Sequence, residues 1–280
     1  MSTKVHAIQT GLVKVKLAQM SAVGAGIGRF GHVLFDRAWS DWVPILAWLI
    51  EHDEGLILVD TGETARVHDP GYHPRWHPFY RLASRFRVTP DDELGPRLKA
   101  MGVSVKDIRH VVLTHLHTDH AGGLGHVATQ KTWVHPLEWV RAQGIGGRIQ
   151  GYLPNRWPRG WQPERLRFER RANGPFVEQM PLTTRGDVTV VPTPGHTPGH
   201  VSVIVRGEPS IFIAGDTSYT EALLKAHVVD GVNPDERVTR ATGEAILQLA
   251  STEPIVYLPS HDPESAQRLA DRETLRAGPR

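Results

Sequence analysis

The sequence predicts a mixed α/β or α+β sandwich, and three observations support this prediction. Short apolar stretches bounded by turn residues recur along the 280 residues, as is typical of strands buried in a sheet. Helix-start signals lie between and after these stretches. The composition, with 40% hydrophobic and 22% charged residues, is that of a globular chain with a sizeable core. Strands and helices mixed in this way pack as layers around a shared core.

The predicted strands are short and end at glycine, proline or polar residues. They occupy residues 43–50, 55–60, 110–114, 132–135, 188–192, 200–206, 210–215 and 254–259. The first of them, VPILAWLI, is the longest apolar run in the chain. It is too short to cross a bilayer, which takes about 20 residues, so we interpret it as a buried strand.

Three helices are predicted from their first turns. Each starts at a capping residue that is followed by proline and by acidic residues, which favour the positive end of the helix dipole. The predicted ranges are 91–101, 235–250 and 264–275.

Two stretches fit neither pattern. Residues 63–90 are rich in proline, histidine and aromatic residues, and residues 144–175 are rich in glycine, proline, tryptophan and arginine. We expect both to be loop insertions on a single domain that spans residues 1–280. Five aromatic residues are candidates for a pocket wall, although such residues more often belong to a core: Trp42, Trp76, Phe79, Tyr80 and Phe86.

The charge balance limits the classes of partner. Lys and Arg number 32 and Asp and Glu number 30, so the net charge of +2 predicts no nucleic-acid or membrane partner unless a local patch provides one. One basic stretch exists, with eight arginines and two glutamates between residues 141 and 171, and we interpret it as a solvated face or a subunit contact. The lack of cysteine and of an apolar leader predicts a cytoplasmic protein.

Histidine is the unusual feature, with 16 residues, and four potential ligands lie close together in VVLTHLHTDHAGG. Side chains that alternate at a strand end face the same way, so we expect His115, His117 and Asp119 to converge, with the next turn bringing His120 round. The glycines that follow allow a close approach of the chain. A solvated or core histidine cluster is the alternative, but burying four polar groups without partners is costly, which favours metal ligation.

Three later segments supply further ligands at or near strand ends. They contain His196 (TPGHTPGH), Asp216 (IFIAGDTSY) and His261 (PIVYLPSHD). Seven ligands exceed the four of a tetrahedral zinc site. They suit two divalent metal ions, zinc in the first place, that share a bridging carboxylate and a bridging water or hydroxide.

The pattern HLHTDHAGG with the later His196, Asp216 and His261 resembles the metallo-β-lactamase superfamily, and the segment VDTG at 59–62 is similar to its early aspartate motif. The resemblance implies an αββα sandwich with the site at one edge of its two sheets. It also implies His115, His117 and His196 on the first metal, Asp119, His120 and His261 on the second, and Asp216 between them.

Within the superfamily, GDTSYT at 215–220 and SHDPE at 260–264 are most similar to the N-acyl-homoserine lactonases, which open the lactone ring of quorum-sensing signals. The resemblance implies a cyclic-ester hydrolase, a homodimer, and a contact between Tyr219 and the lactone. Asp119, near the attacking water, is the candidate proton shuttle, with a pure ligand role as the alternative. We expect His200 and Asp60 to support the ligands from outside.

Two other kinds of function stay open. A thioesterase of the glyoxalase II kind or a phosphodiesterase can use the same seven ligands, and the arginine-rich stretch favours either. A non-catalytic metal or nucleic-acid binding module is the third interpretation, and it requires a coordinatively closed site.

Overall fold

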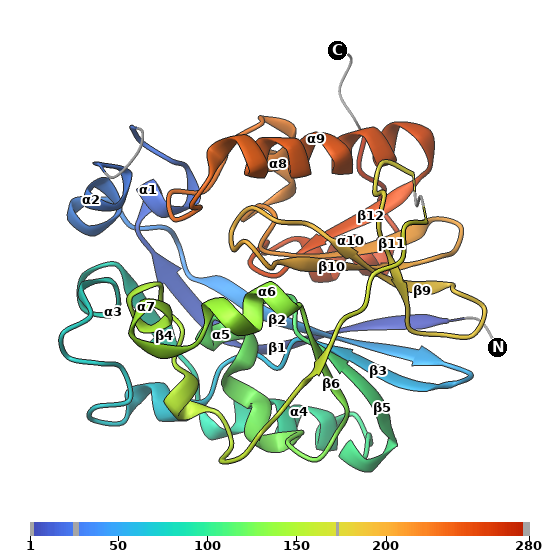
Figure 1. Ribbon diagram of the computed structural model, residues 1–280, viewed down its shortest axis with the longest axis horizontal. Helices are drawn as coiled ribbons and strands as arrows, with labels where there is room; N and C mark the ends of the chain where they lie inside the picture. Colours follow the sequence, from blue (N-terminus) through green and yellow to red (C-terminus); the bar gives the residue numbers. More distant parts are fainter. Residues whose placement is uncertain (1–2, 25–27, 172–173, 277–280) are drawn as a thin grey trace.

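The computed structural model describes residues 3–24, 28–171 and 174–276. In this part of the chain, strands form two stacked sheets and helices cover the outer faces (Figure 1). The strand order is β4-β1-β2-β3-β5-β6-β7 in the first sheet and β12-β11-β10-β9-β8 in the second. The sandwich that the sequence predicts is therefore confirmed.

The strands of the first sheet are β1 (Lys4–Val15), β2 (Val43–His52), β3 (Gly55–Val59), β4 (Ser84–Arg87), β5 (Ile108–Val112), β6 (Thr132–Val134) and β7 (Glu164–Arg165). Those of the second are β8 (Met180–Pro181), β9 (Val188–Pro192), β10 (Val201–Val205), β11 (Ser210–Gly215) and β12 (Ile255–Pro259). The run β3-β5-β6-β7 and the pair β11-β12 are parallel, so their carboxyl ends meet at one edge of each sheet.

The helices are α1 (Leu17–Met20), α2 (Gly28–Phe35), α3 (Pro78–Leu82), α4 (Leu94–Ala100), α5 (Thr118–Ala121), α6 (Pro136–Arg141), α7 (Gly144–Ile149), α8 (Glu221–Lys225), α9 (Glu236–Thr252) and α10 (Ser265–Asp271). The long helix α9 covers the second sheet, where Ile246 and Leu249 pack with Phe212. Helix α4 belongs to the core outside the first sheet, through Leu94 and Leu98.

Apolar side chains of the two sheets meet in the middle of the sandwich. Trp48 and Ile57 of the first sheet share one buried cluster with Val190, Val203 and Ile213 of the second. Burial of each such side chain stabilises the fold by about 1.5–3 kcal/mol. This interior holds the two sheets together and so fixes the loops at their common edge.

Two of the predicted helices differ from the structure for identifiable reasons. The one predicted over 91–101 is divided into a 3₁₀ turn (Pro90–Asp92) and α4, because Pro96 has no N–H and its ring would clash with the carbonyl group of Asp92 in a continuous helix. The one predicted over 264–275 ends at Asp271, because Arg272 takes a left-handed φ of 52°.

The two predicted insertions lie against each other at one end of the molecule. The Nε2 atom of His77 is 3.1 Å from the carbonyl oxygen of Ile149, and the hydroxyl of Tyr80 donates to that of Gly151 at 2.5 Å. They contain short elements, including α3, β4 and α7; positions 172–173 of the second one lie outside the described residues. Among the described helices, none has the length and hydrophobicity that a membrane span requires.

Candidate metal centre

The seven predicted ligands gather at the edge of the sandwich where strands of both sheets end. His115 and His117 lie on the loop after β5, and Asp119 and His120 lie on α5. The second sheet supplies the other three from the loops after β9, β11 and β12: His196, Asp216 and His261. The site therefore depends on both sheets.

One part of the sequence argument is wrong. Strand β5 ends at Val112, so His115 and His117 are loop residues and not alternate positions of a strand. Asp119 lies on the helical turn α5 and groups with His120 and His261, not with His115 and His117. Gly123 allows the close approach of the chain that we expect, because a Cβ atom at this position would lie 2.2 Å from the backbone oxygen of Thr61.

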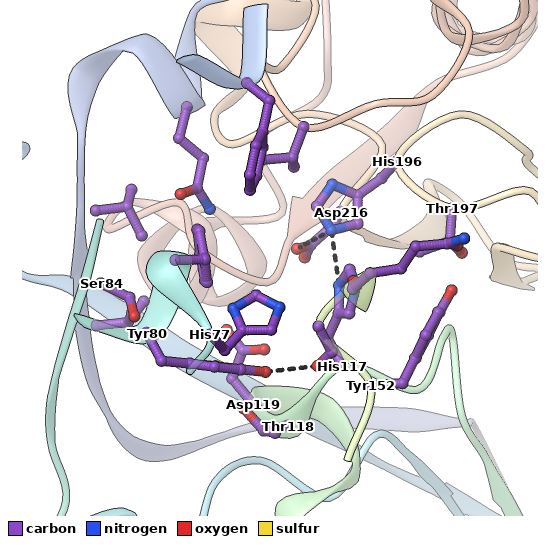
Figure 2. A pocket seen from close by; sticks show the side chains of 18 of the residues that line it. His77, Tyr80, Ser84, His117, Thr118, Asp119, Tyr152, His196, Thr197 and Asp216 are labelled. Atoms are coloured by element: carbon purple, nitrogen blue, oxygen red, sulfur yellow. Dashed lines mark hydrogen bonds and ion pairs between the residues drawn. The ribbon is translucent and has the colours of Figure 1, made fainter. Parts of the chain in front are cut away.

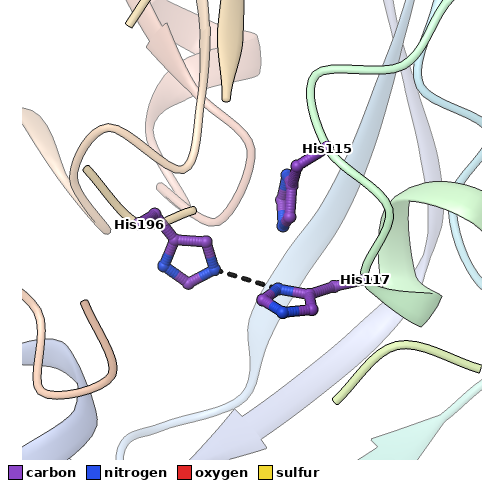
Figure 3. A group of neighbouring side chains, drawn as sticks. All are labelled: His115, His117 and His196. Carbon is purple, nitrogen blue, oxygen red and sulfur yellow. Dashed lines mark hydrogen bonds between the residues drawn. The ribbon is translucent and has the colours of Figure 1, made fainter. Parts of the chain in front are cut away.

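Three sets of side chains place their ligand atoms within 4.8 Å of one another and can each hold a metal ion. The sets are His115, His117 and His196; His115, His120 and Asp216; and Asp119, His120 and His261. Figure 3 shows the rings of the first set around a common space, with Nδ1 of His117 3.1 Å from Nε2 of His196.

The carboxylate of Asp216 lies between these sets. Its Oδ2 atom is 3.5 Å from Nε2 of His196 and 3.4 Å from Nε2 of His261, while Oδ1 is 3.3 Å from Nε2 of His120. A single carboxylate thus reaches histidines of more than one set, which is the position of a bridging ligand.

Several atoms of the cluster are buried without a hydrogen-bond partner among the described residues. They include Nε2 of His115, Nε2 of His120 and Oδ1 of Asp216. A buried polar atom left without a partner costs about 1–3 kcal/mol. Three such atoms that face one another fit a cation, which would bind all of them.

The ring nitrogens that point away from the cluster are held by other groups. The Nδ1 atom of His120 is 2.9 Å from Oδ2 of Asp60, and Nδ1 of His261 is 2.8 Å from the carbonyl oxygen of Pro44. His117 places its Nε2 atom 3.2 Å from the carbonyl oxygen of Gln150. Such contacts fix the orientation and tautomer of a metal-binding histidine.

Asp60 organises two of the predicted ligands at once. Its carboxylate is fully buried and accepts hydrogen bonds from the backbone N–H of Thr114 at 2.7 Å and from the Thr114 hydroxyl at 2.8 Å, besides its contact with His120. The same hydroxyl lies 3.1 Å from Nδ1 of His115. The geometry agrees with the supporting role that we expect for Asp60.

His200 faces the backbone and not the cluster. Its Nε2 atom accepts a hydrogen bond from the N–H of Asp216 at 3.0 Å, and its Nδ1 atom is 2.9 Å from the hydroxyl of Thr193. Burial lowers the pKa of His200 to about 3, so the ring stays neutral and Nε2 remains an acceptor. His200 therefore positions Asp216.

The electrostatics of the cluster suit cation binding. Burial, and then the neighbouring His196, lowers the pKa of His117 to about 4, so its ring is neutral at pH 7. Burial opposes ionisation of Asp216, but His261 and His120 outweigh it and hold the pKa of that carboxyl well below its usual range. Burial disfavours protonation of His120, His196 and His261, but neighbouring carboxylates outweigh it and raise the pKa of all three rings. A divalent metal would therefore bind these three rings in exchange for protons.

Sequence reasoning missed Glu138, which lies on α6 and is fully buried. Its carboxylate accepts a hydrogen bond from the N–H of Leu116 at 3.1 Å and another from the hydroxyl of Thr197 at 2.8 Å. It therefore joins the loop of His115 to the loop of His196. The local sequence carries no signal for this contact, because the role depends on loops far apart in the chain.

A cavity of about 420 Å³ opens beside the cluster (Figure 2). Its polar end is lined by predicted ligands, among them Asp119, Asp216 and His261. The apolar lining consists mainly of Val13, Val15, Phe30, Phe79, Phe86 and Val232, with Tyr80 beside them. The predicted pocket wall is thus correct for three of the five aromatic residues. It is wrong for Trp42, which packs against Arg87, and for Trp76, which is 57% exposed.

Tyr219 lines the cavity next to the cluster. Its ring centre is 5.7 Å from that of His261, and its hydroxyl accepts a hydrogen bond from Nε2 of Gln19 at 2.6 Å. Burial, and then the charge of Asp216, raises the pKa of Tyr219 well above its usual value, so the hydroxyl keeps its proton. Because it accepts from Gln19, this O–H can donate into the cavity.

The arginine-rich stretch does not overhang the cluster as one surface. Of its eight arginines, Arg141 is the one that lines the cavity in the described part of the chain. Arg156 donates to the carbonyl oxygen of Tyr72, and Arg165 lies over the ring of Trp139 at 4.4 Å. Arg156 and Arg165 are therefore engaged elsewhere.

Comparison with known proteins agrees with this architecture. Residues 40–261, more than half of the chain, match the family described as "Metallo-beta-lactamase superfamily". An N-acyl homoserine lactonase of a Bacillus species is 31% identical over 189 residues, which are 64% of this chain and 66% of that protein, just under two thirds of its length. The N-acyl homoserine lactonase AttM of Azorhizobium caulinodans is 26% identical over 80% of this chain and 83% of its own.

Solved structures extend the similarity of fold to nearly the whole chain. An N-acyl homoserine lactone hydrolase with N-hexanoyl-L-homoserine at its catalytic metal centre superposes with a TM-score of 0.75 at 22% identity, covering 95% of this chain and 96% of the other. AidC, a dizinc quorum-quenching lactonase, gives a TM-score of 0.64 at 17% identity over 94% and 88% of the two chains. With this fold and the family match over residues 40–261, the chain belongs to the metallo-β-lactamase superfamily.

Proposed function

We propose that this protein is a metal-dependent hydrolase that opens the lactone ring of N-acyl-homoserine lactones. One observation carries the proposal: a single cavity joins the histidine and aspartate cluster to an apolar wall. An acyl lactone has the matching chemistry, since its polar ring would lie at the cluster and its alkyl chain along the wall. The lactonases among the relatives and similar structures support the same substrate class.

The proposed ligands form two sites that share one carboxylate. His115, His117 and His196 would hold the first divalent cation, Asp119, His120 and His261 would hold the second, and Asp216 would be shared by both. Zinc fits this mixture of imidazole and carboxylate groups. When bound, two such cations supply an activated water and polarise the ester carbonyl group. Because ligands come from both sheets, residues 1–280 would act as one domain, and the homodimer stays a prediction.

The chain's own residues would handle the substrate and its protons. Tyr219 would donate a hydrogen bond to the carbonyl oxygen as negative charge develops there, since its hydroxyl is protonated and free to donate. Asp119 would carry a proton to the leaving alkoxide. Its side chain is 19% exposed against 7% for Asp216, and it lines the cavity where the ring would lie.

Thioesters and phosphodiesters are the competing substrates. The cavity lining contains one arginine, Arg141, and mostly apolar side chains elsewhere away from the cluster, which suits a neutral acyl compound better than a phosphodiester.

A substrate panel tests the proposal. The zinc-loaded protein is assayed with a pH indicator against acyl-homoserine lactones, thioesters and phosphodiesters, and its metal content is measured. We expect close to two metal ions per chain and the highest kcat/KM with a lactone. Asp216→Asn should lose metal and activity together, while Asp187→Asn, far from the cluster, should lose neither. Inactivity of the metal-loaded protein on all lactones would remove the proposed function.

A further inference from the structure

The mouth of the cavity carries exposed apolar side chains. Phe30 and Ile149 line the cavity and are 40% and 60% exposed to solvent. Ile145, four residues before Ile149 on α7, is 76% exposed, and Trp76 is 57% exposed. The ring of Trp76 lies 5.4 Å from that of His77, which itself contacts the carbonyl oxygen of Ile149. We call Phe30, Trp76, Ile145 and Ile149 the mouth patch. Exposed apolar residues gathered in this way mark an interaction site.

Arginines accompany the mouth patch. Arg75 precedes Trp76 in the chain, Arg148 precedes Ile149, and Arg141 lines the cavity; all three are exposed. A surface that presents both aliphatic tips and cations is suited to a partner with an apolar interior and an anionic surface.

Two of the three segments that build this end of the molecule offer no exposed acidic residue to balance the arginines, and in the third, α2, Arg29 is paired with Glu236. Residues 71–88 contain four arginines and no Asp or Glu. Residues 136–163 contain four arginines and one acidic residue, Glu138, whose side chain is fully buried. The whole chain is nearly neutral at +2, so the positive charge is local to this surface.

We propose that the mouth patch docks on the surface of an anionic phospholipid bilayer. The isoleucine, phenylalanine and tryptophan side chains would enter the region between headgroups and acyl chains, and the neighbouring arginines would bind the phosphate headgroups. Figure 1 places α2, α3 and α7 together at one end of the sandwich, so the contributing elements can approach a flat surface at the same time.

Charge complementarity favours a bilayer over a second copy of this chain. A two-fold symmetric dimer would place the same patch on both sides of its interface, so arginines would face arginines with no exposed acidic partner in either segment. A nucleic acid would neutralise the arginines but would leave Ile145 and Ile149 against phosphates and sugars, where they gain no burial.

The position of the patch gives docking a consequence for catalysis. Phe30, Ile149 and Arg141 belong both to the cavity lining and to its exposed rim, so a bound bilayer would lie directly at the opening. An amphiphile dissolved in the bilayer would then enter the cavity from the lipid phase. This consequence rests on the proposed function, whereas bilayer binding itself does not.

Vesicle binding tests the proposal without any substrate. The zinc-loaded protein is sedimented with vesicles of phosphatidylcholine alone and with vesicles that also contain phosphatidylglycerol. We expect binding to the anionic vesicles and release at high salt. Arg148→Glu should weaken binding by about fivefold or more, and Ile145→Glu should weaken it at least as much.

Matched substitutions away from the patch serve as controls. Val177 is 65% exposed and lies outside the patch, and Lys106 is an exposed cation on the turn before β5, at the other end of that strand from the cluster. Val177→Glu and Lys106→Glu should leave binding unchanged. The proposal is overturned if anionic vesicles do not sediment the protein, or if the controls weaken binding as much as the patch variants. It is also overturned if Ile145→Glu converts a dimer to a monomer without affecting vesicle binding.

Discussion

The substitution Asp60→Asn isolates the contribution of one buried carboxylate to metal binding. Asp60 contacts Nδ1 of His120 at 2.9 Å and accepts from the N–H of Thr114 at 2.7 Å. Asparagine has nearly the same shape but replaces one acceptor oxygen with an N–H donor. The new donor must face one of these two partners, and the two orientations have different costs.

If the amide nitrogen faces His120, it donates to Nδ1 and the ring proton moves to Nε2. That atom faces Asp216 and must be free of a proton to bind a cation. The loss of such a supporting contact lowers metal affinity about 10–100-fold, or about 1.4–2.8 kcal/mol. If the amide nitrogen faces Thr114, two donors meet in a buried site and one N–H loses its partner, which destabilises the fold by about 1–3 kcal/mol.

Two measurements separate these outcomes. Zinc affinity is obtained by competition with a coloured chelator, and the unfolding free energy of the metal-free protein is obtained from urea titration. Asp187→Asn is the matched control, because Asp187 also pairs with a buried histidine, His52 at 3.1 Å, but far from the cluster. If Asp60→Asn keeps both the zinc affinity and the unfolding free energy of the parent, the role given to Asp60 is wrong.

Three further predictions concern single side chains. Tyr219→Phe should lower turnover of a lactone by up to about 100-fold with the metal content unchanged, and equal turnover would exclude the hydrogen bond to substrate. Burial raises the pKa of Glu63 from 4.5 to about 8, so between these values the folded state retains a proton that the unfolded chain has lost. The unfolding free energy of the metal-free protein should therefore fall as pH rises through this window, by up to about 1.4 kcal/mol per unit. Glu63→Gln should make that fall less steep by the contribution of Glu63, whereas the same pH dependence of the unfolding free energy in both proteins would show that Glu63 does not titrate there. Gly215→Ala should destabilise by about 2–3 kcal/mol, because Gly215 has a φ of 58° and a Cβ atom would lie 2.6 Å from Nε2 of His200; Gly31→Ala, where a Cβ meets nothing within 4 Å, is the control in urea unfolding.

The parts of the fold that could be predicted are those specified by local pattern. Strands β9 and β11 have the predicted bounds, because each is an apolar run closed by proline or glycine. The N-terminal strand β1 was not predicted, since its sequence KVHAIQTGLVKV mixes polar and apolar residues and its burial alternates over part of its length only. It forms a strand because it pairs with β2, which lies further along the chain.

The candidate site shows the same division. The ligands could be proposed from sequence because each lies in a short motif near a strand end. The supporting residues could not, because Asp230, 3.5 Å from Nδ1 of His196, and Glu138 have no motif of their own. Their significance arises from tertiary contacts that join segments far apart in the chain. The arginines of residues 141–171 likewise have different surroundings, and these depend on how the loop folds and not on the local sequence.

Because the predicted ligands are divided between the two sheets, synthesis and folding of the chain must precede tight metal binding. His261 follows β12, the last strand of the described chain, whereas the first predicted ligands, His115 and His117, follow β5. A nascent chain emerging from a ribosome would therefore present an incomplete chelate for much of its synthesis. Cations could be captured tightly only after the second half had docked on the first. Metal acquisition would then report on completed maturation, and a truncated product would be distinguishable by its failure to retain zinc.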